Sequence, residues 1–312
     1  PKNERALATG IFNSGANIGA VAAPILVPWI LGVYGWEMAF IIIGALGFIW
    51  MGFWVFMYDK PEKHPKVSEA ELEYIQQDVI ADSKIAGYVP ESTTKVSLMD
   101  CFKYKQTWAF AIGKLLTDPI WWFYLFWLPD FLESQYHIKG TAIALPVAAV
   151  YTMSAVGSIF GGWLPMYFIK KNWPVFKARK SSMLLYAFLV LPILFAQVLG
   201  GMNMWLAVFV IGIAAAAHQA WSANIFTTVS DMFPKRAVGS VTGIGGMFGA
   251  IGGILLSMAV QKNLFVHYRS IGQIETAYYI MFIVCGSAYL LAWLIMHLLV
   301  PKVSVIAAED LE

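Results

Sequence analysis

The sequence predicts an all-α polytopic membrane protein, and its composition and patterning carry that prediction. Apolar residues make up 59% of the 312 residues and charged residues only 13%, and the mean hydropathy is +0.65. Soluble domains contain about 45–50% apolar and about 25% charged residues, so this chain has too little charge to cover a water-facing surface. Its apolar residues form continuous runs, whereas the strands of a membrane β-barrel alternate.

These apolar runs have the length of membrane-spanning helices. A spanning helix needs about 20 mostly apolar residues. Eight candidates meet this requirement, at residues 6–32, 38–58, 106–131, 142–169, 181–199, 205–229, 238–260 and 276–300.

The distribution of Lys and Arg predicts the orientation of these spans. If the spans alternate in direction, 17 of the 21 basic residues fall on one side of the membrane. The other side carries Lys139, Lys262 and Arg269, and Lys114 lies inside a span. Because cytoplasmic loops carry an excess of basic residues, both ends of the chain are expected in the cytoplasm.

The segment 59–105 is the one long polar stretch, and its seven lysines and nine acids nearly cancel. Pro61 and Pro65 end the preceding span. Ser68 and Glu71 have the spacing of a capping box, which predicts a short amphipathic helix through about Lys84. We interpret this segment as a cytoplasmic connector between two bundles, with a regulatory or partner-binding role as the alternative.

A weak internal repeat predicts how the spans are grouped. A shift of 233 residues places Pro1-Lys2 on Pro234-Lys235, Gly10-Ile11 on Gly243-Ile244, and Gly19 on Gly252. Four spans precede the second copy within its half and none precedes the first. We therefore expect an N-terminally truncated chain with about eight of twelve helices. The expected parts are the last two helices of an N-terminal six-helix bundle (1–58), the connector (59–105), a C-terminal six-helix bundle (106–300) and a tail (301–312).

Several functional classes are disfavoured. Two cysteines, Cys101 and Cys285, argue against a disulfide framework or a metal cluster, and a net charge of +2 does not indicate nucleic-acid binding. The glycines at 243–246 lie inside an apolar span and follow no strand, so they do not indicate a nucleotide loop. We expect no enzyme, cofactor or metal; a membrane-embedded enzyme, a sensor scaffold and a channel remain as alternatives to a transporter.

The third span carries ionisable residues at membrane depth, where they usually have a function. Lys114 and Asp118 are four residues apart on one helix face and can form an intramembrane ion pair. Trp121 continues that face and Tyr124 lies beside it, which suits a polar or anionic solute with a carbon ring. The alternative is a purely structural pair. Pro119 is expected to interrupt the hydrogen-bond ladder of the helix, which frees backbone carbonyls and gives a flexible point.

Two other spans carry polar clusters. In the sixth span His218, Trp221 and Ser222 share one face, and Gln219 lies about 100° away; their donors and acceptors suit carboxylate and hydroxyl oxygens. In the first span Asn13 and Asn17 share a face. Hydrogen bonding between helices is the alternative for both clusters. The spacing of Gly15 and Gly19, and of Gly245, Gly249 and Gly253, predicts close helix packing.

A family resemblance is carried by the segments Gly10–Asn13, Ile18–Ala20, Trp36–Ile42, Asp118-Pro119, Trp127–Pro129, Gly161–Pro165, Arg179-Lys180 and Ala217–Ala220. In these segments the chain resembles the major facilitator superfamily, and within it the anion:cation symporter family, most closely bacterial hexuronate transporters.

This resemblance implies a monomeric symporter that moves an organic anion, such as a sugar acid, with a proton across the bacterial inner membrane by alternating access. It implies a central cavity between the two halves. The residues expected to line it are Asn13, Asn17, Trp121, Tyr124, His218, Gln219, Trp221 and Ser222. The proton-coupling acids of that family lie in its first four helices, so no coupling role is carried onto this chain. Other substrates of the family leave gluconate-type, aromatic and glutamate-like acids as alternatives to a hexuronate.

Overall fold

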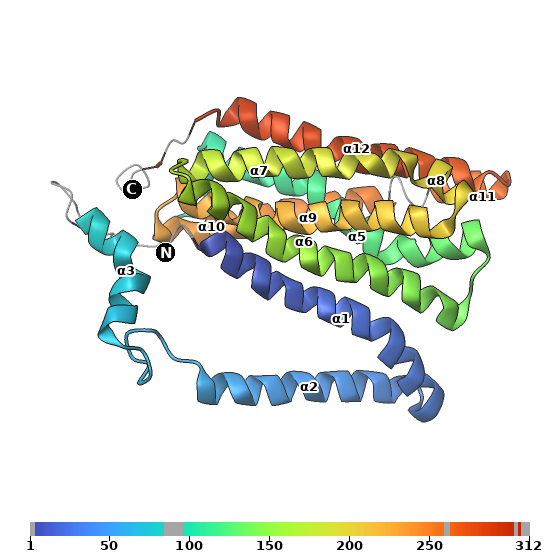
Figure 1. Cartoon of the computed structure of the whole chain (residues 1–312), viewed down its shortest axis with the longest axis horizontal. Coiled ribbons are helices and arrows are strands. Elements are labelled where there is room, and N and C mark those ends of the chain that lie inside the picture. The colour runs from blue at the N-terminus through green and yellow to red at the C-terminus, as the bar shows by residue number, and fades with distance from the viewer. Residues whose placement is uncertain (1–3, 84–95, 259–262, 303–304, 307–312) are drawn as a thin grey trace. The chain divides into compact units, whose positions relative to one another are not determined.

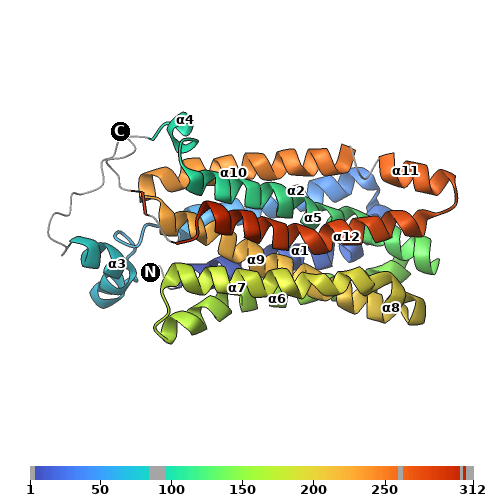
Figure 2. The ribbon, with the colours of Figure 1, turned by 90° about the horizontal axis from the view of Figure 1, so that it is seen from above.

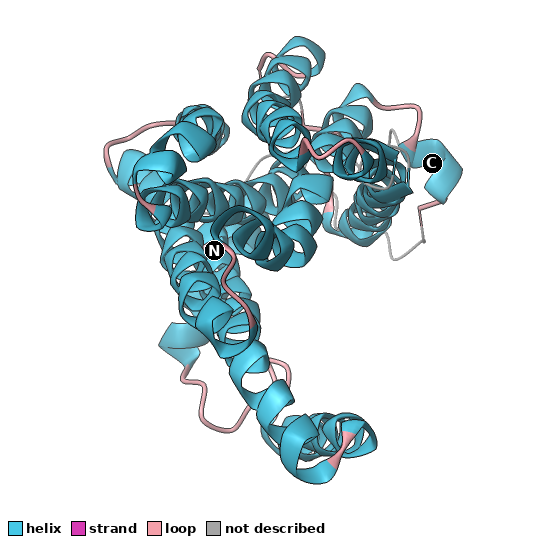
Figure 3. Cartoon of the chain, turned by 90° about the vertical axis from the view of Figure 1, so that its right-hand side faces the viewer, coloured by secondary structure: helices cyan, strands magenta, loops and turns pink. Residues whose placement is uncertain are grey.

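A computed structural model describes residues 4–83, 96–258, 263–302 and 305–306. Within these ranges the secondary structure consists of helices and connecting loops, as Figure 3 shows, which confirms the all-α prediction. The described helices form two compact units, residues 20–83 and residues 4–19 with 96–306. Pro1, Lys2, Lys84, Lys262 and most of the expected tail lie outside the described residues.

The helices have the dimensions that the hydropathy predicts. Six described segments are long and apolar enough to cross a membrane, and a bent pair, Arg5–Ala23 and Ile25–Tyr34, makes a seventh. Helix α5 (Lys105–Tyr136) is equally long, but its charged and polar residues lower its hydropathy. With α5 included, the described helices correspond to the eight predicted spans.

The smaller unit contains the second part of α1 (Arg5–Tyr34), then α2 (Trp36–Met57) and α3 (Glu69–Ser83). This part of α1 contains Pro28, which has no N–H to donate to the carbonyl four residues earlier. Ser68 Oγ accepts a hydrogen bond from the Glu71 N–H at 3.2 Å. The predicted cap of the short helix is therefore confirmed.

The larger unit is a bundle of long helices that run side by side (Figure 1). These helices are α5, α6 (Ala144–Lys170), α7 (Val175–Val190), α9 (Met204–Met232), α10 (Lys235–Leu255) and α12 (Ile274–Leu299), together with the first part of α1. Shorter helices extend or join them. These are α4 (Leu98–Cys101), α8 (Ala196–Met202) and α11 (Asn263–Ser270), with the 3-10 turns Gly140–Ile143 and Leu191–Phe195. Figure 2 shows α4 and α11 at opposite ends of this unit.

The basic residues of the larger unit gather at one end of the bundle. The N–H of Ile306 donates to the carbonyl of Met232 at 2.9 Å, and Lys180 Nζ donates to the carbonyl of Val300 at 2.5 Å. These contacts bring the start of α7 and the ends of α9 and α12 together. Arg269 and Lys139 lie at the opposite end, where they pair with Asp130 and Glu133. Within this unit, most basic residues thus lie at one end of the bundle, as expected if the spans alternate in direction.

Glycines allow the closest helix contacts. A Cβ added at Gly157 or Gly161 of α6 would collide with the backbone of Ala216 or Ala220 of α9, so these two helices pack through small residues as membrane helices often do. Gly245 and Gly249 of α10 allow the same approach to α5. In the described residues nothing lies within 4 Å of a Cβ added at Gly15 or Gly19, and the close contact predicted there is instead made by Gly10, which packs against Ser158.

Helix α5 continues from Lys105 to Tyr136 across Pro119, and only its hydrogen-bond ladder is interrupted there. Proline removes the hydrogen bond to the carbonyl of Leu115. That carbonyl oxygen lies against Gly252 of α10, where an added Cβ would collide with it. The packing of α10 therefore supports α5 at the position where its own hydrogen-bond ladder is incomplete.

Candidate functional site

His218 is held between two aromatic side chains inside the larger unit. Its Nδ1 lies 2.6 Å from the hydroxyl of Tyr289 on α12. The indole ring of Trp121 on α5 stacks on the imidazole, with the ring centroids 5.1 Å apart and the planes inclined by 6°. His218 is only 4% exposed. Its second ring nitrogen, Nε2, makes no hydrogen bond to the described residues and can therefore serve a ligand.

An amide network lies beside His218. Asn17 Oδ1 accepts a hydrogen bond from Ser154 Oγ of α6 at 2.8 Å, and Gln219 Nε2 of α9 approaches the same oxygen at 3.5 Å. Asn17 is 1% exposed and Gln219 is 8% exposed. The first part of α1 is thereby joined to α6 and α9 through polar side chains.

Tyr151 of α6 connects these two groups of residues. Its ring meets the edge of Trp121 at a centroid distance of 6.2 Å, and its backbone carbonyl lies 2.8 Å from Ser154 Oγ. The arrangement therefore forms one cluster of polar and aromatic side chains from five helices. We call it the His218 cluster, and its members are Asn17, Trp121, Tyr151, Ser154, His218, Gln219 and Tyr289.

The remaining predicted residues occupy different environments. Asn13 and Ser222 are half-buried, and the carbonyl of Asn13 accepts a hydrogen bond from Asn17 Nδ2 at 3.2 Å. Trp221 and Tyr124 are 0% and 1% exposed. Trp221 packs edge-on against Tyr289 at 5.6 Å. Trp221 and Tyr124 thus lie in the packed interior, and their assignment to the cavity stays a prediction.

The intramembrane ion pair forms within α5. Lys114 Nζ lies 2.7 Å from Asp118 Oδ2 and 4.0 Å from the centre of the Phe226 ring. Gly249 of α10 makes room for the carboxylate, since an added Cβ would collide with it. Each charge is therefore compensated by the other. Trp121 follows Asp118 by about one helical turn, which places the pair next to the His218 cluster along α5.

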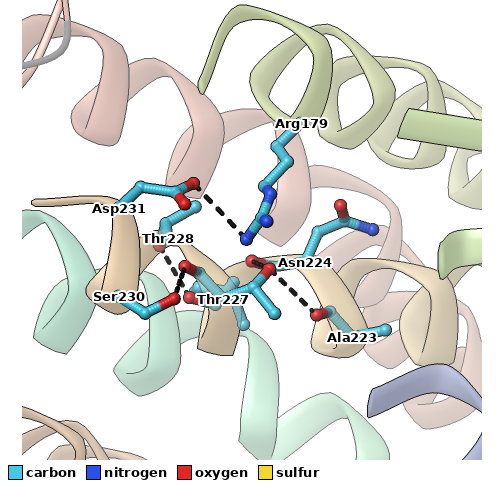
Figure 4. A network of polar contacts seen from close by, with 8 residues as sticks. Arg179, Ala223, Asn224, Thr227, Thr228, Ser230 and Asp231 are labelled. Atoms are coloured by element: carbon cyan, nitrogen blue, oxygen red, sulfur yellow. Dashed lines mark hydrogen bonds and ion pairs between the residues drawn. The ribbon is translucent and has the colours of Figure 1, made fainter. Parts of the chain in front are cut away.

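A second polar network fixes the basic end of the bundle (Figure 4). Arg179 of α7 is fully buried and lies 3.4 Å from Asp231 of α9. Asn224 Nδ2 donates to the carbonyl of Gly161 at 2.7 Å, and the hydroxyl of Tyr186 donates to the same carbonyl at 3.1 Å. These bonds join α6, α7 and α9. Two of the segments that carry the family resemblance, Gly161–Pro165 and Arg179-Lys180, contribute residues to these contacts.

The opposite end carries a smaller network. Both carboxylate oxygens of Asp130 accept from Arg269 Nη2, at 2.9 and 2.8 Å, and Asp130 also accepts from the hydroxyl of Tyr278. These contacts join the end of α5 to α11 and α12. Asp130 and Glu133 both lie in ion pairs at this end.

The His218 cluster offers aromatic surface and neutral hydrogen-bonding groups. Such a set can pack against a carbon ring and bind hydroxyl or carboxylate oxygens. Among the described residues no group of three or more His, Cys, Asp or Glu side chains could hold a metal ion. Ser154, Tyr151 and Tyr289 could not be predicted as members of this cluster, because no local sequence pattern shows which polar residues of separate helices meet.

Comparison with known proteins decides the family. The sequence matches the Major Facilitator Superfamily over residues 1–257. This chain belongs to the Major Facilitator Superfamily. The family expected from the sequence is therefore confirmed, and the described helices are those of a superfamily member.

The superfamily members most similar to this chain include sugar-acid transporters. The Hexuronate transporter of Escherichia coli (strain K12) is 31% identical over 264 residues, which cover 83% of this chain and 59% of that protein. The Galacturonate transporter of Dickeya chrysanthemi is 32% identical over 170 residues, covering 54% and 48%. The D-galactonate transporter of Escherichia coli O6:H1 (strain CFT073) is 25% identical and covers 83% and 60%. The chain thus spans about half to three fifths of the length of these relatives.

A solved structure supports the fold. A bacterial homologue of the iron transporter ferroportin, in its outward-facing state, matches with a TM-score of 0.53 and 16% sequence identity. The match covers 95% of this chain and 65% of that one. At this identity the match bears on the fold alone.

Proposed function

We propose that this protein is a secondary active transporter that imports a hexuronate, galacturonate or glucuronate, by proton symport with alternating access. The observation that carries the proposal is the His218 cluster, which gathers one imidazole, two amides and an indole ring from separate helices into the membrane-spanning bundle. The likeness to proteins named hexuronate and galacturonate transporters supports the substrate class.

The chemistry of a hexuronate fits this cluster. The sugar ring has apolar faces that pack against an indole such as Trp121, and its hydroxyl groups both donate and accept hydrogen bonds. His218 Nε2 and the amides of Gln219 and Asn17 supply complementary groups. We assign these three residues to hydrogen bonds with the sugar hydroxyl groups, and Trp121 to stacking on the sugar ring. Asn13 and Ser222 lie at the edge of the proposed site.

The proposal includes an orientation and a set of partners. The basic end of the larger unit faces the cytoplasm of a bacterium, in keeping with the excess of positive charge on cytoplasmic loops. The protein acts as a monomer in the inner membrane, with an organic anion and a proton as its small partners. No residue of this chain is assigned to proton coupling.

A different sugar acid is the second candidate substrate. Relatives that cover the same 83% of this chain are named D-galactonate and probable galactarate/D-glucarate transporters. These acids lack the closed ring of a hexuronate. Competition between substrates therefore separates the two candidates.

The deciding experiment is uptake of labelled galacturonate and glucuronate into cells that lack their own transporter and express the full-length protein. Saturable uptake that rises at acid external pH and collapses with a protonophore is expected. Galactonate or galactarate that competes more strongly than either hexuronate would favour the second candidate. Absence of uptake of all these acids, with the protein present in the membrane, would contradict the proposal.

Alanine variants of His218 and Gln219 test the site. Each should abolish uptake while the protein still reaches the membrane, because each removes a group that contacts the solute. His267 of α11 and Gln197 of α8 are matched controls: both are polar residues at the far end of the bundle, where Gln197 donates to the carbonyl of Glu275 at 2.6 Å. Normal transport by H218A and Q219A would overturn the site assignment.

A further inference from the structure

A groove of about 420 Å³ lies at the basic end of the larger unit, between the beginning of α7 and the end of α12. It is separate from the His218 cluster. Its lining combines charged and apolar side chains, among them Lys177, Lys180, Leu184, Trp293 and Lys302.

The mouth of the groove is positively charged. Three lysines line it, and no Asp or Glu is among its lining residues. Lys177 and Lys302 are exposed and have no carboxylate partner among the described residues. Lys180 Nζ donates to the carbonyls of Val300 and Pro301, at 2.5 and 3.3 Å. These two carbonyls hold the ammonium group of Lys180 at the groove without neutralising its positive charge.

The interior of the groove is apolar and lies deeper along the helices. Leu184 follows Lys177 by seven residues of α7, which corresponds to about 10 Å along the axis. Trp293 forms the facing wall, where its indole N–H donates to the carbonyl of Lys180 at 2.9 Å. His297, which is half-buried, stacks on Trp293 at 4.8 Å. A cationic mouth above an apolar floor at the end of membrane-spanning helices matches the division of a phospholipid into head group and acyl chain.

We propose that this groove binds an anionic phospholipid from the surrounding leaflet. The phosphate lies among Lys177, Lys180 and Lys302, and an acyl chain follows Leu184 and Trp293 toward the membrane interior. Basic pockets between membrane helices bind acidic head groups in this manner, and each lysine near the surface adds to the attraction. The inference does not depend on the transported solute.

The test is native mass spectrometry of the purified chain in neutral detergent, titrated with phosphatidylglycerol or with phosphatidylcholine of the same acyl chains. Phosphatidylglycerol should bind about thirtyfold more tightly, as expected from the attraction of about two unpaired lysines. The double variant K177Q/K302Q should lose about that factor for phosphatidylglycerol and bind phosphatidylcholine as before. Both side chains are exposed, so the substitutions should leave the fold intact.

The double variant K170Q/K171Q is the matched control, because it removes two exposed lysines from the end of α6 at the same end of the bundle. It should retain the affinity of the unmodified chain. A second variant, L184W, fills the floor of the groove and should weaken phosphatidylglycerol binding without changing the charge.

Three results would overturn the proposal. One is equal affinity for the two lipids, and another is an equal loss in the control variant, which would indicate attraction to the whole basic surface. The third is full competition by soluble glycerol phosphate together with normal binding by L184W, because that pair of results would identify a site for a free phosphate ester.

Discussion

At the scale of single residues, we propose that Tyr289 positions His218. Its hydroxyl lies 2.6 Å from Nδ1, and a hydrogen bond to one ring nitrogen fixes which tautomer and which orientation the other nitrogen presents. Replacing Tyr289 with Phe keeps the ring that packs against Trp221 and removes only this bond. We expect the KM for uptake to rise about fivefold, since such a bond contributes roughly 1 kcal/mol, while kcat changes little.

Tyr186→Phe is the matched control for this prediction. It removes another buried tyrosine hydroxyl, one that donates to the carbonyl of Gly161, away from the His218 cluster. It should lower thermal stability to a similar extent and leave the KM for uptake unchanged. An unchanged KM in Y289F, or an equal rise in Y186F, would show that Tyr289 has no specific effect on His218.

The residues of the candidate site could be predicted only in part from the sequence. Helical periodicity places His218, Trp221 and Ser222 on one face, because that geometry is local. The same periodicity does not reveal that Trp221 is enclosed by α12, or that Ser154 and Tyr289 meet Asn17 and His218. Those contacts join residues 71 to 137 positions apart, and they depend on how separate helices pack.

At the scale of helices, hydropathy and charge are sufficient to predict most of the architecture. Continuous apolar runs predict the spans, and the cap at Ser68 predicts the start of α3, since both signals lie within a few residues. The interruption expected at Pro119 affects only the hydrogen-bond ladder: α5 stays continuous, and α10 packs so closely on it that the carbonyl of Leu115 lies against Gly252. A local rule about proline does not include that neighbouring helix.

The contact between α5 and α10 gives a second prediction. Replacing Gly249 with Ala would drive a methyl group into the Asp118 carboxylate, so α10 must move away or the Lys114–Asp118 pair must rearrange. We expect a destabilisation of roughly 1–3 kcal/mol, typical of overpacking, measured as a lower midpoint of thermal unfolding in detergent.

Gly246→Ala provides the comparison on the same helix. In the described residues nothing lies within 4 Å of a Cβ added at Gly246, so this substitution should leave the unfolding midpoint unchanged or raise it slightly, because alanine favours a helix over glycine. Equal midpoints for the two variants would mean that α10 does not approach α5 as closely as the structure shows.

At the scale of the whole molecule, the ends of the larger unit differ in charge and in bonding. The basic end is held by the buried Arg179–Asp231 pair and by Lys180 on the carbonyl of Val300. The opposite end is held by the Asp130–Arg269 pair. Breaking a buried pair is far more costly than breaking an exposed one, so the basic end is the more firmly joined of the two. The exposed lysines of the basic end can therefore contact lipid, and their positive charge can determine how the protein is oriented in the membrane.

The orientation of the molecule can be tested with introduced cysteines. Lys139 and Lys171 are exposed at opposite ends of the larger unit, and each is a site for a single cysteine. Applied to intact cells, a membrane-impermeant thiol reagent should label K139C. K171C should react only after the membrane is opened, because we propose that the basic end faces the cytoplasm.

The natural cysteines give little background in this experiment. Cys101 and Cys285 are free and buried. For Cys101, which lies outside the spans, burial and then the nearby Asp100 carboxylate raise the pKa of the thiol, so little reactive thiolate is present at neutral pH. The Lys139–Glu133 pair is exposed, and its loss should cost little stability. Labelling of K171C in intact cells with K139C protected would reverse the orientation, and with it the leaflet that supplies the lipid to the groove between α7 and α12.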